Sequence, residues 1–340
     1  MNSFKYGVEV EYLILDAETY KPLWFEELNF KKLYSIIEDI SLDGIPSMEG
    51  IDPEDAHDKI LPYVIEGYHL KNEDNIAHDM APKGVEIRTP VCHSISELMT
   101  CLRTLHERLE SKMFQNGYRL SAISHHPVAK KFQGPRCNRR HDFWKWALEA
   151  MLTYGPDINI SFPENISEKL FSNMDDFEEK INYYGPALTA LSLSSPFYDL
   201  GLKKDYYQQT IKSNRTFRRS TIAPMIEWHK EEDGRVEFKF FEMSNNFNDY
   251  HAFTLMCLGL SLCDDLKSRA SNQEYLNIEN YLVDKIKCNS VVKRYYDDLN
   301  TESQKWYQYT DKDNKIYYEN KINGKTVWKL PKNGIIINKV

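Results

Sequence analysis

Apolar and acidic residues alternate near the N-terminus, in the segment GVEVEYLILD. Successive side chains of a strand point to opposite faces, so Val8 and Val10 share one face while Glu9 and Glu11 share the other. The α-carbons of the two acids then lie about 6.5 to 7 Å apart. Such a strand requires a core on one side and, on the other, a surface that accommodates two neighbouring carboxylates. We expect it to belong to an antiparallel sheet.

The same alternation recurs in three later segments, VEIRTP, DINISF and VEFKFFE. The residues that share the polar face are Glu86 with Arg88, then Asp157, Asn159 and Ser161, and finally Glu237 with Lys239. One interpretation is an ordinary sheet with one buried and one hydrated face. The other is a metal site, because paired carboxylates repel each other and a hard cation such as Mg²⁺ prefers oxygen ligands. The interleaved Arg and Lys side chains suit anionic substrate groups.

Strand and helix patterns are mixed along the rest of the chain. Helical periodicity is found at 22–41, 95–116, 143–154 and 250–270, and residues 183–200 suit a buried helix that breaks at Pro196. Strands are expected at 4–16, 85–91, 118–124, 157–162, 222–228 and 235–243, and 47–79 is predicted to be irregular. The order has neither regular βαβ repetition nor a glycine-rich phosphate loop, which favours an α+β fold.

Composition excludes several classes of protein. The net charge of −8 argues against non-specific nucleic-acid binding, because no excess of basic residues is present to neutralise phosphates. No apolar run reaches the roughly 20 residues that span a bilayer, and the N-terminus does not resemble a signal peptide. The six cysteines are scattered without a CxxC pair. We therefore expect a cytoplasmic globular enzyme with reduced thiols and no membrane partner, and an oligomer is compatible with the sequence.

Five segments, in order, resemble the type 2 glutamate-cysteine ligases and related bacterial carboxylate-amine ligases. They are GVEVEYLILD, KGVEIRTPVCHSISEL, SAISHHPV, PALTALSLSSPFYDLGL followed by SNR, and RVEFKFFEMS. The resemblance covers residues 4–270 and implies a glutamine-synthetase-like fold, in which helices lie outside a curved antiparallel sheet. It also implies a ligase that uses ATP and Mg²⁺ to join a carboxylate, of a glutamate-like molecule or a peptide, to an amine through an acyl phosphate.

The resemblance also assigns candidate site residues. It implies Glu9, Glu11, Glu86 and Glu237 as metal ligands, with Glu9, Glu237 and Arg215 as the catalytic candidates. The candidates for binding nucleotide or substrate anions are Arg88, Asn159, Arg215 and Lys239. Two departures from the family pattern concern the substrate: DINIS stands where the family has HVHVG, and Lys239 replaces an arginine, although lysine cannot make a bidentate fork. The substrates could therefore differ from glutamate and cysteine.

Composition shifts near residue 300 to the aromatic segment WYQYTDKDNKIYYENKINGKTVWKLP. Its aromatic runs are separated by turn sequences, including the hairpin signal Asn-Gly. The segment resembles a WW domain, which implies a small three-stranded antiparallel sheet with Tyr318 and Trp328 facing a peptide ligand. The alternative is a small sheet that packs against the ligase domain. We predict a ligase domain at 1–300 and a WW-like module at 301–340.

Two other functions remain open at this stage. One is a scaffold in which the large domain has lost catalysis and the WW-like module recruits a peptide partner. The other is a phosphotransferase of related architecture, such as a guanidino kinase, which would use the same metals and ATP. The four acids favour the enzyme, because a scaffold has no reason to keep four carboxylates at one site.

Overall fold

The fold is taken from a computed structural model, which describes residues 3–51, 53–72, 76–128, 132, 151–192, 225–266, 305–310, 316–320, 326–327 and 335–337. Its main feature is a seven-stranded sheet in which every pairing is antiparallel. The sheet runs in the order β2-β3-β1-β5-β7-β6, and β4 also pairs with β1. Its strands are β1 (Lys5–Asp16), β2 (Tyr63–Lys71), β3 (Ala77–Arg88), β4 (Tyr118–Ser121), β5 (Pro156–Ser161), β6 (Ile226–His229) and β7 (Arg235–Phe238).

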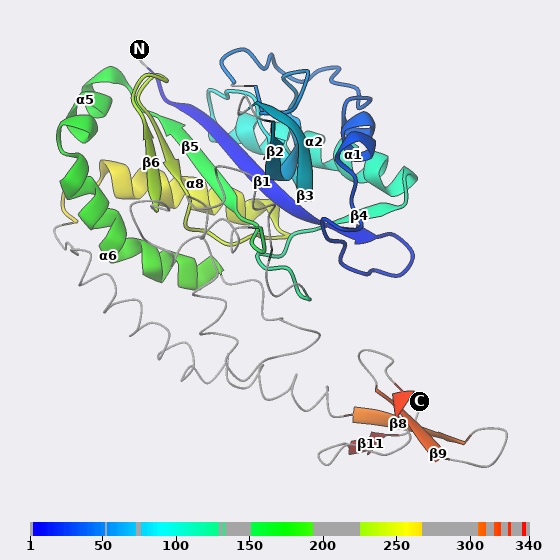
Figure 1. Ribbon diagram of the computed structural model, residues 1–340. Helices are drawn as coiled ribbons and strands as arrows, with labels where there is room; N and C mark the ends of the chain where they lie inside the picture. The colour runs from blue at the N-terminus through cyan, green and yellow to red at the C-terminus, as the bar shows by residue number, and fades with distance from the viewer. Residues whose placement is uncertain are drawn as a thin grey trace.

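The sheet curls, and helices cover its apolar face (Figure 1). The helices are α1 (Phe30–Ile37), α2 (Ile95–Gln115), α5 (Glu164–Ser172), α6 (Met174–Ser192) and α8 (Phe247–Leu262). Helix α2 contacts β1, β3 and α8, and α8 also contacts β5. This arrangement confirms the expected mixture of helices with an antiparallel sheet.

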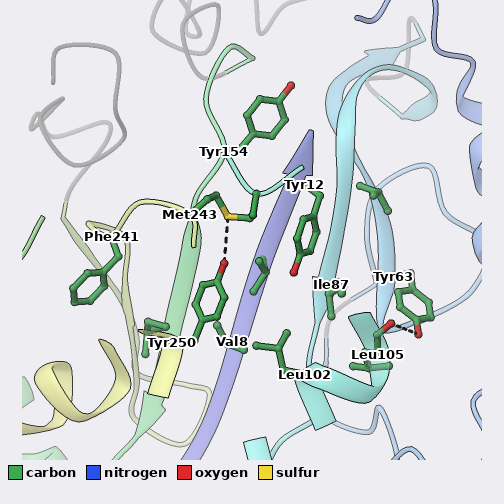
Figure 2. Close-up of a cluster of buried hydrophobic side chains, with 14 of the residues drawn as sticks. Val8, Tyr12, Tyr63, Ile87, Leu102, Leu105, Tyr154, Phe241, Met243 and Tyr250 are labelled. Atoms are coloured by element: carbon green, nitrogen blue, oxygen red, sulfur yellow. Dashed lines mark hydrogen bonds between the residues drawn. The ribbon is translucent and has the colours of Figure 1, made fainter. Parts of the chain in front are cut away.

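Alternation along β1 determines which face becomes the core. Val8 and Val10 are buried against α2, where Leu102 and Leu105 are fully buried one turn apart. Figure 2 shows Val8 and Leu102 in this core and Leu105 beside Tyr63, whose hydroxyl donates a hydrogen bond to the Leu105 carbonyl oxygen at 3.1 Å. The opposite face of the sheet is left to the polar residues.

Helix α2 shows how local sequence determines its ends. The Ser94 hydroxyl accepts a hydrogen bond from the Glu97 amide at 3.1 Å, and the Glu97 carboxylate accepts one from the His93 amide at 2.7 Å, a reciprocal capping arrangement. Gly117, which follows the helix, has φ +85°, a conformation that favours glycine. The predicted helix at 95–116 is thus confirmed to within one residue.

Several predicted elements differ from the structure. The segment 47–79 is not irregular throughout, because it contains β2 and the start of β3. Within 22–41 only α1 is helical, since Asn29 caps it by accepting a hydrogen bond from the Lys32 amide. Residues 151–154 form turns and a bridge, and helix α6 begins at Met174 rather than 183. Residues 143–150 and 193–200 lie outside the described residues.

A second sheet is formed near the C-terminus by β8 (Lys305–Thr310), β9 (Ile316–Asn320), β10 (Thr326–Val327) and β11 (Ile335–Ile337). Strand β9 pairs antiparallel with both β8 and β10, and the WW-like assignment stays a prediction. The sheet is not three-stranded, however, because β11 pairs with β8 in parallel. Among the described residues, no helix is long and apolar enough to cross a membrane.

Candidate active site

Strand register brings the predicted acids onto one face of the main sheet. Glu9 on β1 lies opposite Asp157 on β5, and Glu11 lies opposite Glu86 on β3. On β7, Glu237 lies opposite Asn159 of β5. Four central strands therefore place carboxylates side by side, on the face opposite the hydrophobic core.

The acids divide between two adjoining clusters. The outer cluster consists of Glu9, Asp157 and Glu237, and the inner cluster of Glu11, Glu66 and Glu86. Within each cluster one carboxylate oxygen from each residue lies within 4.8 Å of the others. Since Glu9 and Glu11 are two residues apart on β1, the clusters are neighbours. The four predicted metal ligands thus share one surface but are split between these two sets.

Cations contact both clusters. In the outer cluster, Lys239 Nζ lies 2.7 Å from Glu237 Oε1 and 3.5 Å from Asp157 Oδ2. His229 Nε2 lies 3.1 Å from Glu237 Oε2. In the inner cluster, Lys83 Nζ lies 3.0 Å from Glu11 Oε2. The clusters therefore already contain protein cations that partly offset their negative charge.

Arg88 lies beside the two clusters. Its Nε donates a hydrogen bond to Glu86 Oε1 at 2.8 Å, and its guanidinium also contacts Glu54. Although burial opposes ionisation of Glu54, hydrogen bonds from His69 and Arg88 lower the pKa of its carboxyl to about 2. Arg88 is thus held in place from two sides, and one end of the acidic face gains a fixed positive charge.

Burial affects the acids unequally. It raises the pKa of Glu9 above its usual value, and the neighbouring Glu237 carboxylate adds to the rise. It also raises the pKa of Glu86 well above its usual value, although Arg88 opposes this shift. Burial of Glu237 acts in the same direction, but Lys239 and His229 outweigh it and hold the pKa of Glu237 far below the usual range. Glu237 is therefore ionised, whereas a further cation would favour ionisation of Glu9.

A cavity of about 1040 Å³ opens over the outer cluster. Glu9 and Glu237 line it together with the cationic side chains of Arg88, Arg235 and Lys239. Further lining residues come from 46–47, 49–51, 53–54 and 231–233. The volume of the cavity lies near the upper end of the range of about 300 to 1,000 Å³ that is usual for small-molecule sites. The cavity exposes acids and bases together, a combination that suits a phosphorylated ligand accompanied by a metal.

The predicted anion-binding residues have different surroundings. Arg88, Asn159 and Lys239 all line the cavity. The Asn159 amide oxygen accepts a hydrogen bond from Arg235, and its amide nitrogen donates one to Glu9 Oε1 at 3.4 Å. Arg215 and Trp328 lie outside the described residues, and Tyr318 lies on β9. Their roles stay predictions.

Sequence reasoning did not identify three residues of this face. Glu66 belongs to a segment predicted to be irregular, although the alternation in YVIEGYHL indicates a strand whose polar face includes it. His229 ends β6, and no motif distinguishes it. Lys83 lies out of phase with Glu86 along β3, so simple alternation places it on the wrong face.

The donor set of the outer cluster fits a divalent cation. It offers three carboxylates, the hard oxygen donors that Mg²⁺ prefers, and two of them, those of Glu9 and Glu237, line the cavity. Octahedral Mg²⁺ has ligands at about 2.1 Å, so oxygens that share an ion lie roughly 3 to 4 Å apart. The spacing of the outer-cluster oxygens is compatible with this geometry after small adjustments of the side chains.

Comparison with known proteins identifies the family. Residues 5–210, more than half of the chain, match glutamate-cysteine ligase family 2 (GCS2). The chain belongs to this family. The match includes β1, β3 and β5, so most carboxylates of the two clusters lie within the GCS2 region.

Individual relatives are distant. A putative glutamate–cysteine ligase 2 of Jannaschia sp. (strain CCS1) is 25% identical over 252 residues, which are 71% of this GCS2 chain and 55% of that protein. A glutamate–cysteine ligase of Haloquadratum walsbyi is 23% identical over 137 residues, 38% of this chain and 36% of that protein. The chain thus spans about half the length, or less, of these curated relatives.

Among solved structures, a bifunctional glutathione synthetase from Pasteurella multocida superimposes with a TM-score of 0.47 and 12% sequence identity. The superposition covers 83% of this chain and 41% of that one.

Proposed function

We propose that the chain is an ATP- and Mg²⁺-dependent ligase that joins a carboxylate to an amine. The observation that carries this proposal is the outer cluster of three carboxylates in a GCS2 chain, because two of them, Glu9 and Glu237, line one cavity together with Arg88 and Lys239. A binding scaffold would not require three acids to be held together, because their mutual repulsion costs stability. The alternative of a phosphotransferase would use the same cluster, and the products of the reaction distinguish the two.

Glu9, Asp157 and Glu237 are the residues that would hold Mg²⁺. When bound, the ion would offset the charge that develops during transfer of the phosphoryl group. Arg88, Arg235 and Lys239 line the same cavity and supply positive charge for phosphate or carboxylate oxygens. The family resemblance adds Arg215 to this set as a prediction.

The reaction follows from this distribution of charge. A carboxylate oxygen of the first substrate forms a bond to the γ-phosphorus while the bond to the β-phosphate bridging oxygen breaks, which gives an acyl phosphate and ADP. The lone pair of the amine then forms a bond to the acyl carbon, inorganic phosphate leaves, and the nitrogen loses a proton. The chain contributes mainly by positioning the reactants and by stabilising charge, so no covalent bond to the protein forms.

The site differs from the family pattern at the two β5 positions where relatives have the HVHVG histidines. Asp157 belongs to the outer cluster, and Asn159 is held between Arg235 and Glu9. The two positions that carry histidine in the family pattern thus contribute a carboxylate to the outer cluster and an amide to the wall of the cavity. We propose a glutamate-like or peptide carboxylate as the first substrate and a small or peptide amine as the second.

The test is to incubate the protein with ATP, Mg²⁺ and a panel of carboxylates and amines, and to identify the products by mass spectrometry. An amide, ADP and phosphate are expected in equal amounts, and oxygen-18 in the substrate carboxylate should appear in the phosphate. AMP as a product, or phosphate without the label, would contradict this mechanism. Transfer of phosphate to a stable acceptor without amide formation would indicate the phosphotransferase.

Substitution of Glu237 tests whether the chemistry takes place at the cavity. Glu237→Gln should reduce kcat/KM at least about 100-fold, comparable to the removal of one charge-stabilising group in other enzymes. The matched control is Glu38→Gln, since Glu38 follows α1 and pairs with Lys59 away from the cavity. Equal activity of the two variants would show that the outer cluster is not the site of reaction.

A further inference from the structure

Lys83 reaches the inner cluster through an irregularity in strand pairing. In the β2–β3 ladder, Glu66 lies opposite Gly84 and Gly67 lies opposite Pro82, so the register skips Lys83. A skipped residue of this kind is a β-bulge, which redirects the side chains around it. The bulge explains how Lys83 shares a face with Glu86, although their spacing along an ideal strand would separate them.

The glycines beside the bulge show that the backbone is closely packed there. A Cβ atom on Gly84 would lie 2.2 Å from the carbonyl oxygen of Tyr12, and one on Gly67 would lie 2.2 Å from the carbonyl oxygen of Ala81. Neither backbone oxygen can move without breaking the sheet. Two glycines therefore allow the strands to approach closely on both sides of Lys83.

The Lys83 ammonium is enclosed. The residue is 4% exposed, as is its partner Glu11. Its Nζ lies 3.0 Å from Glu11 Oε2, 3.9 Å from Glu66 Oε1 and 5.4 Å from the centre of the Tyr154 ring, and it donates a hydrogen bond to the Thr153 carbonyl oxygen at 2.9 Å. These contacts hold the positive charge among the carboxylates, where a bound metal ion would otherwise lie.

The carboxylates of the inner cluster are engaged by groups of the protein. Glu11 Oε2 also accepts a hydrogen bond from the Gly155 amide at 3.0 Å, and Glu86 Oε1 accepts one from Arg88. A divalent ion bound by the same oxygens would lie within a few ångströms of the Lys83 ammonium and would be repelled by it. The inner cluster is therefore a poor metal site despite its three acids.

Lys239 provides the contrast in the outer cluster. It lines the cavity, its side chain is 18% exposed, and it also pairs with Glu227 at 3.1 Å. It can therefore move aside toward Glu227 when another cation binds. Lys83 has no such route, because it does not line the cavity and its surroundings are buried.

We propose that the Lys83 ammonium is the built-in cation of the inner cluster, so that a divalent ion binds only at the outer cluster. The inference deepens the proposed function, because it rests on the outer cluster as the metal site of the ligase. It makes Lys83 a positioning residue: the ammonium holds the Glu11 carboxylate in place, two residues along β1 from the proposed metal ligand Glu9. The chain would then need fewer metal ions than its number of acids suggests.

The test counts bound Mn²⁺ by electron paramagnetic resonance, with the metal alone and without nucleotide. The unaltered protein should bind one ion per chain, and Lys83→Met should bind two, because removing the ammonium opens the inner cluster. Lys83→Arg should restore the count to one. Lys239→Met, the matched control, should leave the count at one, since Lys239 does not occupy the inner cluster. A structural role of Lys83 alone would not create a new metal site.

Two further variants keep the test decisive if Lys83→Met does not fold. Glu11→Gln should leave the count at one, whereas Glu9→Gln should abolish binding. Two ions in the unaltered protein, with one lost in Glu11→Gln, would overturn the proposal, as would a folded Lys83→Met that binds no additional ion. If the unaltered protein binds none but Lys83→Met binds one, the role of Lys83 stands while the metal site of the proposed function fails.

Discussion

His126 is expected to make the stability of the protein depend on pH. The residue is 2% exposed, its Nε2 lies 3.3 Å from the Leu23 carbonyl oxygen, and its Nδ1 accepts a hydrogen bond from the Val128 amide at 3.2 Å. This arrangement requires a neutral imidazole, because a proton on Nδ1 would face the Val128 N–H. Burial lowers the pKa of His126 from 6.5 to about 4.

The magnitude follows from linkage between protonation and folding. The unfolded chain binds a proton at His126 as the pH falls below 6.5, whereas the folded chain does so only near 4. The contribution of the neutral His126 to the free energy of unfolding is therefore fully present above pH 6.5, and it is lost progressively as the pH falls toward 4. Between pH 8 and pH 5 this residue alone lowers the free energy of unfolding by about 2 kcal/mol.

Urea unfolding, followed by circular dichroism at pH 8 and pH 5, measures this effect. The loss of stability on acidification should be about 2 kcal/mol smaller in His126→Gln than in the unaltered protein. The control is His251→Gln at an exposed position of α8, which removes a histidine without removing a buried imidazole. An equal loss in the unaltered protein and in His126→Gln would refute the assignment of a buried neutral imidazole.

Three further predictions concern packing and domain organisation. Gly84→Ala should lower the free energy of unfolding by about 3 kcal/mol, because the new methyl group clashes with the Tyr12 carbonyl oxygen. The control is Gly259→Ala, whose methyl group meets nothing within 4 Å and which should be neutral or slightly stabilising in the same urea assay. Leu102→Ala, at a fully buried position, should cost about 2 to 5 kcal/mol, and a thermal midpoint equal to that of the unaltered protein would contradict the described core. Deletion of residues 301–340 should leave amide formation on a small substrate largely intact, and complete loss of turnover would place that segment in the ligase core.

Strand alternation made much of the site predictable. It placed Glu9 and Glu11 on the polar face of β1, and the structure gives both residues acidic partners on neighbouring strands. The core positions of α2 followed from helical spacing in the same way. Such patterns are reliable because burial of one face of an element is the main source of its stability.

The inner cluster was less predictable for physical reasons. The acidic composition of 47–79 concealed the alternation of β2, and Glu66 was missed with it. Lys83 joins the polar face only through a bulge, which depends on pairing with a distant strand and leaves no periodic signal. The division of four predicted ligands into two clusters depends likewise on register, because Glu11 lies opposite Glu86 while Glu9 lies opposite Asp157.

The position of β1 at the centre of the sheet affects the order of events during synthesis. Its residues pair with β3, β4 and β5, and β5 in turn requires β7, which ends at Phe238. At about 5 to 20 residues per second, a ribosome takes roughly 10 to 45 s to proceed from Asp16 to Phe238. During that time the sheet around the earliest strand is incomplete, first at the edges of β1 until β5 ends at Ser161, and then at the edge of β5. We therefore expect the nascent chain to engage chaperones until translation has passed β7, and a ribosome stalled before that point to carry a protease-sensitive, incompletely folded chain.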